Sequence, residues 1–416
     1  MDTNAVTGTS GPLEGIKVLD WTMWQFGPVS TSMMGDMGAD VIKIESFDGD
    51  AGRFLWQASN LPMDIGDGRN AYFETCNRNK RGMAVNLKTQ EGKDIIYELV
   101  KKSDVFVQNF RQGVAERLGL GYESLSEINP MLVYGSANGY GPKGPDSHLP
   151  SFDGSGQARS GLMMSATAPK AEYPARISQG VSDQMGAIML CLGVLASLVS
   201  RQSRGRGQKV DVSHLSSNMW LQAMGMGLTL FLEGRSFEAF DREAPNNPLV
   251  NLYKCKDGKC FQLMHLQPDR YWKDFCQILD LPEVAEDPKY GDMKARAEHS
   301  REIVKILDER FASKTQDEWD RIFRSSGTDL IYSKVQAVEE LVDDPQVIAN
   351  DYITEFDHPV VGKVKMCNHP NIYSHTPAGI WLEAPELGQH TEAILIDELG
   401  YDWDDIERLK EAGAIL

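Results

Sequence analysis

Short apolar strands alternate with helices through the first half of the chain, and this alternation constrains the fold more than any other feature. The chain opens with a strand-like segment at residues 16–20, a helical run from Gly27-Pro28 to Met37-Gly38, and a second strand at residues 41–44. The pattern recurs as strands at 83–87, 105–107, 132–134 and 209–212 and a helix at 89–102. Strands joined through helices pair in parallel, with helices on both faces. The sequence therefore predicts an α/β fold built on a parallel sheet.

The turn after the first strand argues against a dinucleotide cofactor. It reads Trp21-Thr22-Met23-Trp24-Gln25-Phe26-Gly27-Pro28. A pyrophosphate is seated by GxGxxG spacing, which lets the backbone approach the phosphates closely, and this turn does not have it. NAD binding is therefore disfavoured.

The length and a change in composition indicate two domains. A chain of 416 residues can form one large domain and one smaller domain. Between Glu233 and Asn247 the chain becomes charged and rich in Pro and Asn, which is typical of a hinge. Residues 251–263, with an Asp-Gly turn, are typical of a hairpin, and helices follow at 269–279 and 299–313. We expect a large domain over 12–230, a smaller α+β domain over 231–330, and a return to the large domain over 331–416.

Charge and hydropathy exclude some partners. The chain has 60 acidic and 42 basic residues, a formal net charge of -18, which repels nucleic-acid phosphates and anionic membrane surfaces. Its most apolar stretch, residues 187–199, is too short to cross a bilayer and leads into Arg201 and Arg204, so we expect a buried helix there. We predict neither a nucleic-acid partner nor a membrane partner.

The cysteines indicate a reducing compartment. Six are scattered along the chain without CxxC pairs, and no secretory signal precedes them, so we expect a cytoplasmic protein. Cys255 and Cys260 flank the Asp-Gly turn at a spacing that suits no common zinc site without nearby histidines. We therefore assign no metal site, and we expect His214, His265 and His390 to be structural.

A set of different short motifs is distributed along nearly the whole chain. They are Pro12–Asp20, Met34–Glu45, Asn79-Lys80-Arg81, Leu87-Lys88-Thr89, Asn109-Phe110, Arg117-Leu118-Gly119, Asn129-Pro130, Gly139-Tyr140-Gly141, Gly205-Arg206-Gly207-Gln208 and Gly388-Gln389-His390-Thr391. In order and spacing this set resembles the class III CoA-transferases. That family includes formyl-CoA and carnitine CoA-transferases and shares its fold with the alpha-methylacyl-CoA racemases. Each motif is weak alone, whereas their order is specific.

The resemblance implies both a fold and a chemistry. The implied fold is a Rossmann-like large domain, built from both ends of the chain, plus a smaller domain, in a dimer whose two chains interlock. The implied partners are an acyl-CoA and a carboxylic acid, with the coenzyme A thioester as substrate and no tightly bound cofactor. An Asp carboxylate attacks the donor thioester and passes through a mixed anhydride and an aspartyl-CoA thioester. A heteromer with a related chain is an alternative to the homodimer.

Asp183 and Gln25 match the family's catalytic positions. Asp183 lies just before the long apolar helix, where the residues alone favour a helix N-cap and the family match implies the nucleophile. Gln25 matches a position at which family transferases hold the acyl carbonyl, and a neutral donor there can stabilise an oxyanion. The alternative for Gln25 is a polar residue in a strand-to-helix turn.

Three further residues are candidates for substrate contact. Racemases of this fold carry a His-Asp pair where this chain has Phe152-Asp153, and the loss of one of two proton-transfer bases disfavours racemisation. Asp153 is either a substrate contact or a structural cap. Trp24 either forms a wall of the acyl pocket or fills the core.

The expected coenzyme A contacts combine cations for its phosphates with apolar residues for its adenine. They are Phe26, Leu87, Lys88, Thr89, Asn109, Phe110, Arg111 and Arg117. We expect Asn79-Lys80-Arg81 to be structural. Formyl-CoA transferases place an Arg where this chain has Ser46, and we consider Arg53 as a substitute.

The substrate and the reaction type leave alternatives. A run of glycines that closes over the site in formyl-CoA transferases corresponds here to Pro245–Leu249, so oxalate and formate are disfavoured. Trp24 and the Met-rich segment 219–226 favour a larger acid. Two alternatives to the transferase are an isomerase or racemase of the same fold and a non-catalytic subunit of a heteromeric transferase.

Overall fold

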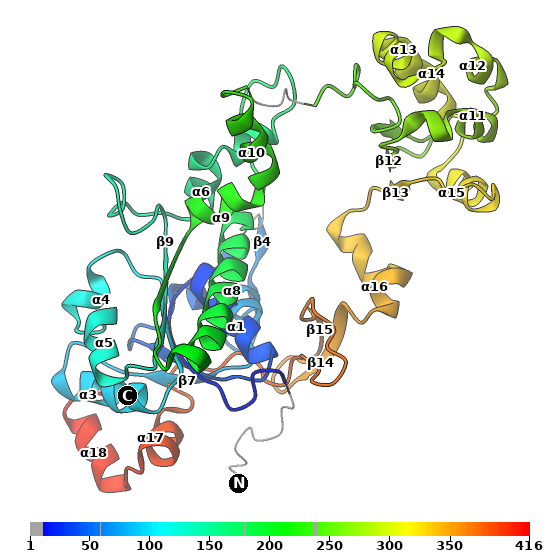
Figure 1. Cartoon of the computed structure of the whole chain (residues 1–416). Coiled ribbons are helices and arrows are strands. Elements are labelled where there is room, and N and C mark those ends of the chain that lie inside the picture. The colour runs from blue at the N-terminus through cyan, green and yellow to red at the C-terminus, as the bar shows by residue number, and fades with distance from the viewer. Residues whose placement is uncertain (1–10, 59, 178–179, 236–239) are drawn as a thin grey trace. The chain divides into compact units, whose positions relative to one another are not determined.

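The chain forms two compact units in the computed structural model, which describes residues 11–58, 60–177, 180–235 and 240–416 (Figure 1). The first unit comprises residues up to 166, 174–237 and 348–416, and the second comprises 167–173 and 238–347. The boundaries expected from the sequence lie at 230/231 and 330/331. In the structure, residues 331–347 group with the second unit, as does the short segment 167–173.

A six-stranded parallel sheet forms the centre of the first unit. The strands are β1 (Lys17–Trp21), β2 (Asp40–Glu45), β7 (Arg81–Ala84), β8 (Val105–Gln108), β9 (Val133–Asn138) and β10 (Lys209–Ser213). Their spatial order is β10-β9-β8-β1-β2-β7, and all adjacent pairs are parallel. This is the doubly wound order. The strands β2 and β7 are added on one side of β1, and β8, β9 and β10 are added on its other side, so the strand order reverses between β1 and β8. The predicted α/β, Rossmann-like fold is confirmed.

Helices cover both faces of this sheet. The helices of the first unit are α1 (Phe26–Asp36), α2 (Ala71–Asn77), α3 (Gln90–Lys101), α4 (Val114–Arg117), α5 (Tyr122–Ile128), α6 (Asp153–Arg159), α7 (Leu162–Ser165), α8 (Val181–Arg204), α9 (His214–Leu221), α10 (Ala223–Phe231), α17 (Thr391–Leu399) and α18 (Trp403–Glu411). Short strand pairs β3 (Gln57–Ala58) with β4 (Leu61–Pro62), β5 (Asp64–Gly66) with β6 (Arg69–Asn70), and β14 (Ile353–His358) with β15 (Gly362–Cys367), and the 3-10 turn η1 (Ala51–Phe54), complete the unit.

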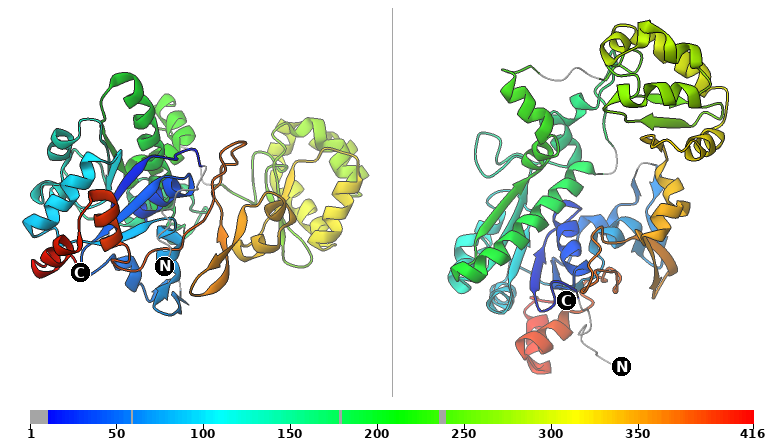
Figure 2. Two further views of the ribbon diagram at one scale, coloured as in Figure 1. Left: turned by 90° about the horizontal axis from the view of Figure 1, so that it is seen from below. Right: turned by 45° about the vertical axis from the view of Figure 1, so that its right-hand side comes forward.

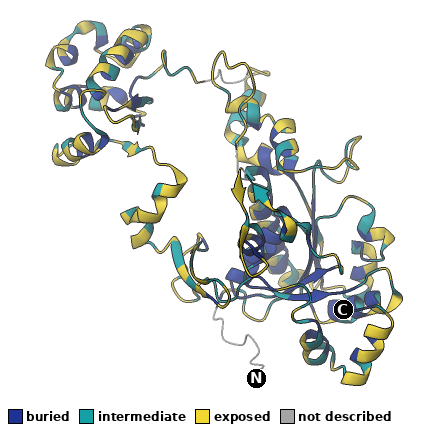
Figure 3. Cartoon of the chain, turned by 180° about the vertical axis from the view of Figure 1, so that it is seen from behind, coloured by how far each residue is buried: buried dark blue, intermediate teal, exposed yellow. Residues whose placement is uncertain are grey.

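Alternation along the strands divides the core between the two faces. Successive side chains of a strand point to opposite faces. In β1, Leu19 joins a cluster with α3, α5, α17 and α18, whereas Val18 joins a cluster with α1 and α8. In β8, Phe106 joins the first cluster and Val107 the second. Figure 3 shows most of this sheet in dark blue, as buried strands, whereas the edge strand β10 is only partly buried.

The end of the chain packs in the first unit. Ile394, Leu395 and Ile406, from α17 and α18, lie in the same buried cluster as Leu19 of β1. Close to the C-terminus, Ile415 forms an isolated bridge with Val85, just beyond β7. Figure 2 shows these red helices and the green α8 on opposite sides of the blue strands.

The long helix α8 is both a core helix and a surface helix. It begins after Gly180 and ends at Gly205, two glycines with left-handed backbone. It is long and apolar enough to cross a membrane, and 44% of its most apolar window is buried. Leu190 and Val194 join the buried cluster on the sheet and Ala187 packs with Val29 and Cys76, while Leu192 is exposed. The expectation of a buried helix thus holds for one face only, and the helix is longer than the apolar stretch 187–199.

The second unit is a separate α+β fold. A three-stranded antiparallel sheet has the order β11 (Leu252–Lys254), β12 (Cys260–Leu263) and β13 (Tyr332–Lys334). Its helices are α11 (Pro268–Ile278), α12 (Pro282–Glu286), α13 (Met293–Glu298), α14 (Ser300–Phe311) and α15 (Gln316–Ser325), with 3-10 turns η2 (Pro288–Tyr290) and η3 (Val338–Asp343), and α16 (Pro345–Ala349) crosses its boundary. Stacked aromatic rings, among them Phe311, Trp319 and Phe323, fill its core.

Candidate active site

The candidate residues gather beyond the carboxyl ends of the parallel strands. Gln25 follows β1, Asn109 follows β8 and His214 follows β10. In open α/β sheets, ligands bind beyond these ends, at the point where the strand order reverses. Here that point lies between β1 and β8. The topology alone therefore favours the turn from Thr22 to Gln25 as part of a ligand site.

Two side chains hold this turn in place. Asn109 Oδ1 accepts a hydrogen bond from the Met23 N–H at 2.9 Å, and Asn109 Nδ2 donates to the Met23 carbonyl at 2.7 Å. The next residue, Trp24, has a left-handed backbone with φ of 67°, and its N–H donates to Asp50 Oδ1 at 3.0 Å. A bulky residue in this conformation is strained and needs such contacts. The turn is thus fixed from both sides.

A buried charge network lies beneath the same turn. Lys43 Nζ donates to the Thr22 carbonyl at 3.1 Å and to Asp50 Oδ2 at 2.9 Å, and Lys80 Nζ donates to Asp20 Oδ2 at 2.7 Å. Burial acts to raise the pKa of Asp20, but the charges of Lys80 and Lys43 hold it below its ordinary value. Both lysines are fully buried, so they position the turn and do not bind phosphate.

Asp183 lies in the first turn of α8. The N-cap of this helix is Gly180, with φ of 71°, which has no side chain of its own to cap the helix. The alternative of Asp183 as an N-cap is therefore wrong, because the N-cap lies three residues earlier and the helix begins at Val181. The partial positive charge of a helix start attracts the negative charge of a carboxylate at this position. Ser182, beside it, is fully buried, whereas the Asp183 side chain is 17% exposed.

His214 contacts Asp183 directly, which sequence analysis missed. Its Nε2 lies 2.8 Å from Asp183 Oδ1, and its Nδ1 lies 3.1 Å from Ser151 Oγ. The imidazole packs against the Phe26 ring, with 4.8 Å between ring centroids. The sequence predicted only a structural role for His214. One signal in the sequence pointed to the site, because His214 directly follows a strand of the parallel sheet, as Gln25 and Asn109 follow theirs.

Gln25 lies beside the start of α8. Its Nε2 is 3.5 Å from the Gly180 carbonyl and 3.4 Å from Gln184 Oε1, which are long contacts. A side chain at Gly180 would overlap the Gln25 amide, since the ideal Cβ position falls against its Oε1. Gln25 is therefore only loosely held, and its amide can turn toward a ligand carbonyl. The structure brings Gln25 and Asp183 to the same helix start.

Aromatic rings surround Trp24. Its ring lies edge-on to Phe152, with 5.9 Å between centroids, and edge-on to Tyr72 at 6.5 Å. Phe152 is 59% exposed, which is high for a phenylalanine next to a candidate site. Burial raises the pKa of Tyr72 and the carboxylate of Asp183 adds to the effect, so its hydroxyl stays protonated. Trp24, Phe152 and Tyr72 form a set that we call the aromatic wall.

Asp153 has protein partners for both of its carboxylate oxygens. Oδ1 accepts from the Ser182 N–H at 2.7 Å, and Oδ2 accepts from Gln157 Nε2 at 2.7 Å. Ser182 is in the first turn of α8, so Asp153 satisfies one of the free N–H groups of that helix from outside it. The cap alternative describes this geometry, and a substrate contact through Asp153 stays a prediction.

The expected coenzyme A contacts occupy different environments. Phe26 is buried under His214, Thr89 caps α3 by accepting from the Gly92 N–H, and Phe110 stacks on Trp21 with 4.2 Å between centroids. Leu87 is half-buried, and Lys88, Arg111 and Arg117 are exposed. The three exposed cations follow β7 and β8, on the candidate edge of the sheet. They are open to a phosphate, and their contact with coenzyme A stays a prediction.

The remaining basic candidates are already paired. Arg53 forms a two-pronged ion pair with Glu45, at 2.8 and 2.7 Å, and stacks on the Phe73 ring. It is therefore not free to replace the arginine expected at Ser46. Arg81 pairs with Asp40 and Glu398, and Asn79 is buried, in keeping with the structural role expected for Asn79-Lys80-Arg81.

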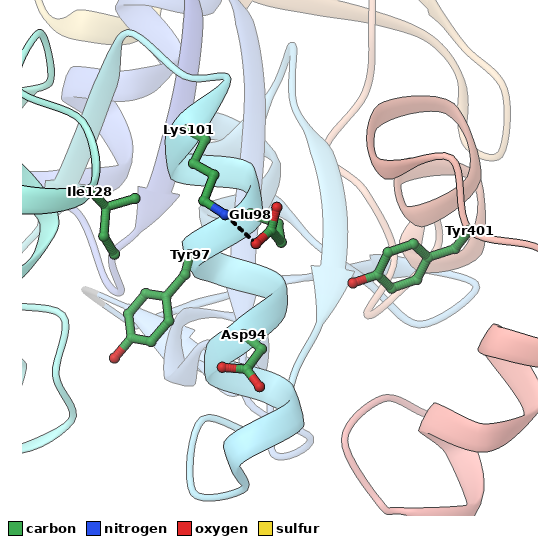
Figure 4. Close-up of a pocket in the computed structure, with 6 residues that line it drawn as sticks. All are labelled: Asp94, Tyr97, Glu98, Lys101, Ile128 and Tyr401. Atoms are coloured by element: carbon green, nitrogen blue, oxygen red, sulfur yellow. Dashed lines mark hydrogen bonds and ion pairs between the residues drawn. The ribbon is translucent and has the colours of Figure 1, made fainter.

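A surface hollow of about 570 Å³ lies elsewhere on the unit (Figure 4). Its lining residues are Asp94, Tyr97, Glu98, Lys101, Ile128 and Tyr401, from α3, α5 and the turn after α17. None of them is a candidate residue, and the hollow lacks an unpaired cation, since Lys101 pairs with Glu98 at 2.5 Å. We do not assign the substrate to it.

The comparisons with known proteins agree with the geometry. The family described as CoA-transferase family III matches residues 13–391. The (R)-2-hydroxy-4-methylpentanoate CoA-transferase of Clostridioides difficile is 32% identical over 403 residues, covering 97% of this chain and 99% of the relative. The succinyl-CoA:glutarate CoA-transferase of Homo sapiens is 33% identical over 406 residues, covering 97% and 90%.

A solved structure is similar over nearly the same span. The crystal structure of a CAIB/BAIF family protein from Brucella suis has a TM-score of 0.80 and 26% identity, and the match covers 93% of this chain and 99% of that chain. The order of the motifs, the parallel sheet and the relatives lead to one conclusion. The chain belongs to CoA-transferase family III, the class III CoA-transferases.

Proposed function

We propose that this enzyme moves coenzyme A from an acyl-CoA donor to a carboxylic acid acceptor, with Asp183 as the nucleophile. One observation carries the proposal. Asp183 Oδ1 is held by His214 at 2.8 Å, while Oδ2 has no hydrogen-bond partner within the described ranges. A carboxylate with one oxygen fixed and the other open, at the edge of the sheet where ligands bind, is arranged for attack.

The proposed reaction has four steps and no net proton transfer. The open oxygen of Asp183 attacks the donor's acyl carbon, the C–S bond breaks, and coenzyme A leaves as a thiolate from a mixed anhydride. The thiolate attacks Cγ of Asp183, the bond from Cγ to the bridging oxygen breaks, and the donor acid leaves as a carboxylate. The acceptor carboxylate then attacks Cγ and expels the thiolate. Finally the thiolate attacks the acceptor's acyl carbon and frees Asp183.

Gln25 is suited to the first and last of these steps. In both steps, negative charge develops on the carbonyl oxygen of the donor's or the acceptor's acyl group. A neutral amide that donates a hydrogen bond there stabilises this charge without exchanging protons. The long contacts of Gln25 Nε2 leave it able to donate to a ligand. Its position beside Gly180 keeps it next to the first turn of α8, which carries Asp183.

We propose that Lys88, Arg111 and Arg117 bind the phosphates of coenzyme A. All three are exposed and follow strands of the parallel sheet at its carboxyl edge. Cations gathered locally are needed because the chain as a whole carries a net charge of -18. Leu87 and Phe110, both half-buried beside them, offer apolar surface for the adenine.

The aromatic wall favours an acid with an apolar or aromatic side chain. Trp24 and the exposed Phe152 offer ring faces and edges to such a group. The named relatives act on a branched hydroxy acid and on dicarboxylic acids. A suitable panel therefore pairs succinyl-CoA, 4-methylpentanoyl-CoA and 3-phenylpropanoyl-CoA with glutarate, 2-hydroxy-4-methylpentanoate and 3-phenyllactate, with mass spectrometry of the coenzyme A products.

The experiment that tests the nucleophile compares Asp183→Asn with the wild type. Asn keeps the size of the side chain but cannot readily form the anhydride, so we expect transfer to fall at least about 10³-fold. With donor alone, borohydride should reduce a wild-type thioester on the peptide that contains Asp183. Asp329→Asn, an exposed residue of the second unit, is the control and should match the wild type. Substantial activity in Asp183→Asn, after deamidation is excluded by mass, contradicts the proposal.

We also propose that the active species is an intertwined homodimer, or a heteromer with a related chain. Exposed apolar side chains along α8 and α10 support this proposal. Within α10, none of the residues is buried. Apolar helix faces of this extent on a single chain are typical of surfaces that pack against a partner.

A further inference from the structure

The contact between His214 and Asp183 has a chemical consequence beyond holding a side chain still. The imidazole of His214 is 5% exposed, and one nitrogen faces Asp183 Oδ1 while the other faces Ser151 Oγ. An ionised carboxylate only accepts hydrogen bonds, so Nε2 must carry a proton. The Ser151 hydroxyl can donate to Nδ1, which fixes this tautomer. The result is an N–H group aimed at one particular oxygen of the proposed nucleophile.

The packing keeps this N–H group in place. The imidazole lies against Phe26, and a side chain at Gly156 would meet the Cβ of His214 at 2.6 Å. His214 is also the first residue of α9, whose N-cap is Ser213 with a capping box. Ring, backbone and hydrogen-bond partners therefore leave the imidazole one position. A donor that does not have to reorganise during a reaction stabilises developing charge most effectively.

We propose that His214 is a catalytic residue that stabilises negative charge on Asp183 Oδ1 in the two middle steps of the transfer. This inference rests on the proposed function. When Oδ2 carries the acyl group, Oδ1 is the carbonyl oxygen of the aspartyl anhydride. Attack of the thiolate on Cγ pushes the carbonyl electron pair onto Oδ1. That oxyanion receives the Nε2–H bond, and its electrons return as the C–Oδ2 bond breaks and the donor carboxylate leaves.

The same donor serves the third step. The acceptor carboxylate attacks Cγ of the aspartyl-CoA thioester, Oδ1 again becomes an oxyanion, and the C–S bond breaks to release the thiolate. The two outer steps occur instead at the acyl carbon of donor or acceptor, where Gln25 is the candidate donor. The site would thus contain two oxyanion contacts: Gln25 for the carbonyl oxygen of the substrate's acyl group and His214 for Oδ1 of Asp183.

This division predicts a change in which covalent adduct accumulates. Each variant is mixed with the donor alone, quenched within milliseconds, and weighed as intact protein, using the panel donor with the highest kcat/KM. The wild type should carry coenzyme A on Asp183, because the thiolate quickly attacks Cγ. His214→Leu, which keeps an apolar contact with Phe26, should carry the acyl group instead. Loss of one oxyanion donor should slow formation of the coenzyme A adduct by about 10²- to 10³-fold.

Two further variants accompany this measurement. His214→Gln places an amide N–H near the position of Nε2 and should restore the coenzyme A adduct in large part. His148→Gln, in an exposed loop, should behave as the wild type. Because the outer steps do not use His214, the KM for the donor should stay within about twofold in His214→Leu while kcat falls. Circular dichroism and thermal unfolding verify that each variant is folded.

Three results would overturn the inference. The first is a coenzyme A adduct in His214→Leu at the wild-type rate. The second is a folded His214→Leu enzyme that forms no adduct of either kind, since His214 would then act before the acyl transfer. The third is a His214→Gln enzyme no better than His214→Leu, since His214 would then act only through packing. Failure of the proposed function looks different, because the wild type itself would carry no adduct on Asp183 with any donor.

Discussion

Asn109 forms two hydrogen bonds with the backbone of Met23, accepting from its N–H at 2.9 Å and donating to its carbonyl at 2.7 Å. This pair joins the segment after β8 to the turn after β1, across the point where the strand order reverses. The Met23 turn carries Trp24 and Gln25. A residue expected to touch coenzyme A therefore has a second role, which is to hold the turn that presents two candidate site residues.

We predict that Asn109→Asp lowers both stability and turnover. The carboxylate loses the donor to the Met23 carbonyl and leaves that carbonyl unpaired, at a cost of about 1–3 kcal/mol. Urea unfolding and kcat at saturating substrates check this. The matched control is Asn129→Asp, because Asn129 Nδ2 likewise donates to the carbonyls of Val100 and Ser103. The control should lose stability but keep its kcat, and an equal loss of kcat in both variants would contradict a specific role for the Met23 turn.

We predict that Gly180→Ala impairs catalysis more than stability. Gly180 has φ of 71°, and an added Cβ would overlap the Gln25 amide. The strain of a left-handed backbone costs about 1 kcal/mol in Gly180→Ala and equally in the control variant Gly161→Ala. Displacement of Gln25 should lower kcat by about 10-fold or more.

Gly161→Ala is the control for this change. Gly161 is also the N-cap residue of a helix, with φ of 83°, but nothing lies within 4 Å of its ideal Cβ position. The two variants should lose similar stability in thermal unfolding, and only Gly180→Ala should lose turnover. If Gly161→Ala is equally slow, backbone strain and not Gln25 explains the effect.

The sequence predicted the sheet well because its strands are buried on both faces and so read as continuous apolar runs, such as Val105–Val107. Gln25 and Asn109 each follow such a run, which puts both beyond the carboxyl ends of parallel strands. The sequence could not predict His214 as a partner of Asp183, because the two are 31 residues apart and only the packing of α8 against α9 brings them together. Nor could it show that Arg53 is already paired with Glu45, which is a tertiary contact.

We predict that Arg117→Ala raises the KM for the acyl-CoA donor about 10-fold and changes kcat at saturation by less than twofold. Arg117 is exposed in α4 and lies beyond β8, so it would contact the coenzyme A moiety remote from the thioester. Such a contact contributes equally to the ground state and the transition state. Arg408→Ala, an exposed arginine of α18, is the control. An unchanged KM in Arg117→Ala contradicts the assignment.

We predict that the second unit loses stability as the pH falls below about 6.5 because of His265. Burial lowers the pKa of His265 from its ordinary value of 6.5. Its Nε2 accepts a hydrogen bond from the Ile331 N–H at 3.1 Å, so the folded state needs the neutral ring. Below pH 6.5 the unfolded chain binds a proton that the folded chain resists, so the free energy of unfolding decreases as the pH falls. Above pH 6.5 both states are neutral and this contribution is constant.

His265→Gln tests this pH dependence. A glutamine can place its Oε1 near the position of Nε2 and accept from the Ile331 N–H without titrating. Urea unfolding is followed between pH 5 and 8 by the fluorescence of the tryptophans in the second unit. In this variant the free energy of unfolding should decrease less steeply as the pH falls below 6.5; we call this part of the curve the acid limb. His148→Gln, exposed in the first unit, should leave the limb unchanged. A limb of the same slope in His265→Gln would show that other groups cause the acid sensitivity.

The last prediction concerns the apolar surface of the first unit. Ile188, Leu192 and Val199 are exposed at a spacing that places them on one face of α8, and their exposed fractions are 41%, 54% and 68%. In α10, Phe231 is 88% exposed. Leaving such side chains in water is unfavourable by about 1.5–3 kcal/mol each relative to full burial. We therefore predict that a second chain covers these two faces in solution.

Light scattering after size-exclusion chromatography should show a dimer, and an intertwined dimer should not separate into folded monomers on dilution, because its chains must unfold to part. Leu192→Arg with Phe231→Glu should destabilise this assembly and yield monomers or aggregates, since it would bury unpaired charge. Val338→Glu, at an exposed apolar residue of the second unit, is the control for a new surface charge and should remain dimeric. A wild-type monomer that stays folded at nanomolar concentration, by circular dichroism, contradicts the prediction. A dimer only in the presence of a related chain would identify the heteromer instead, with the same two faces as its interface.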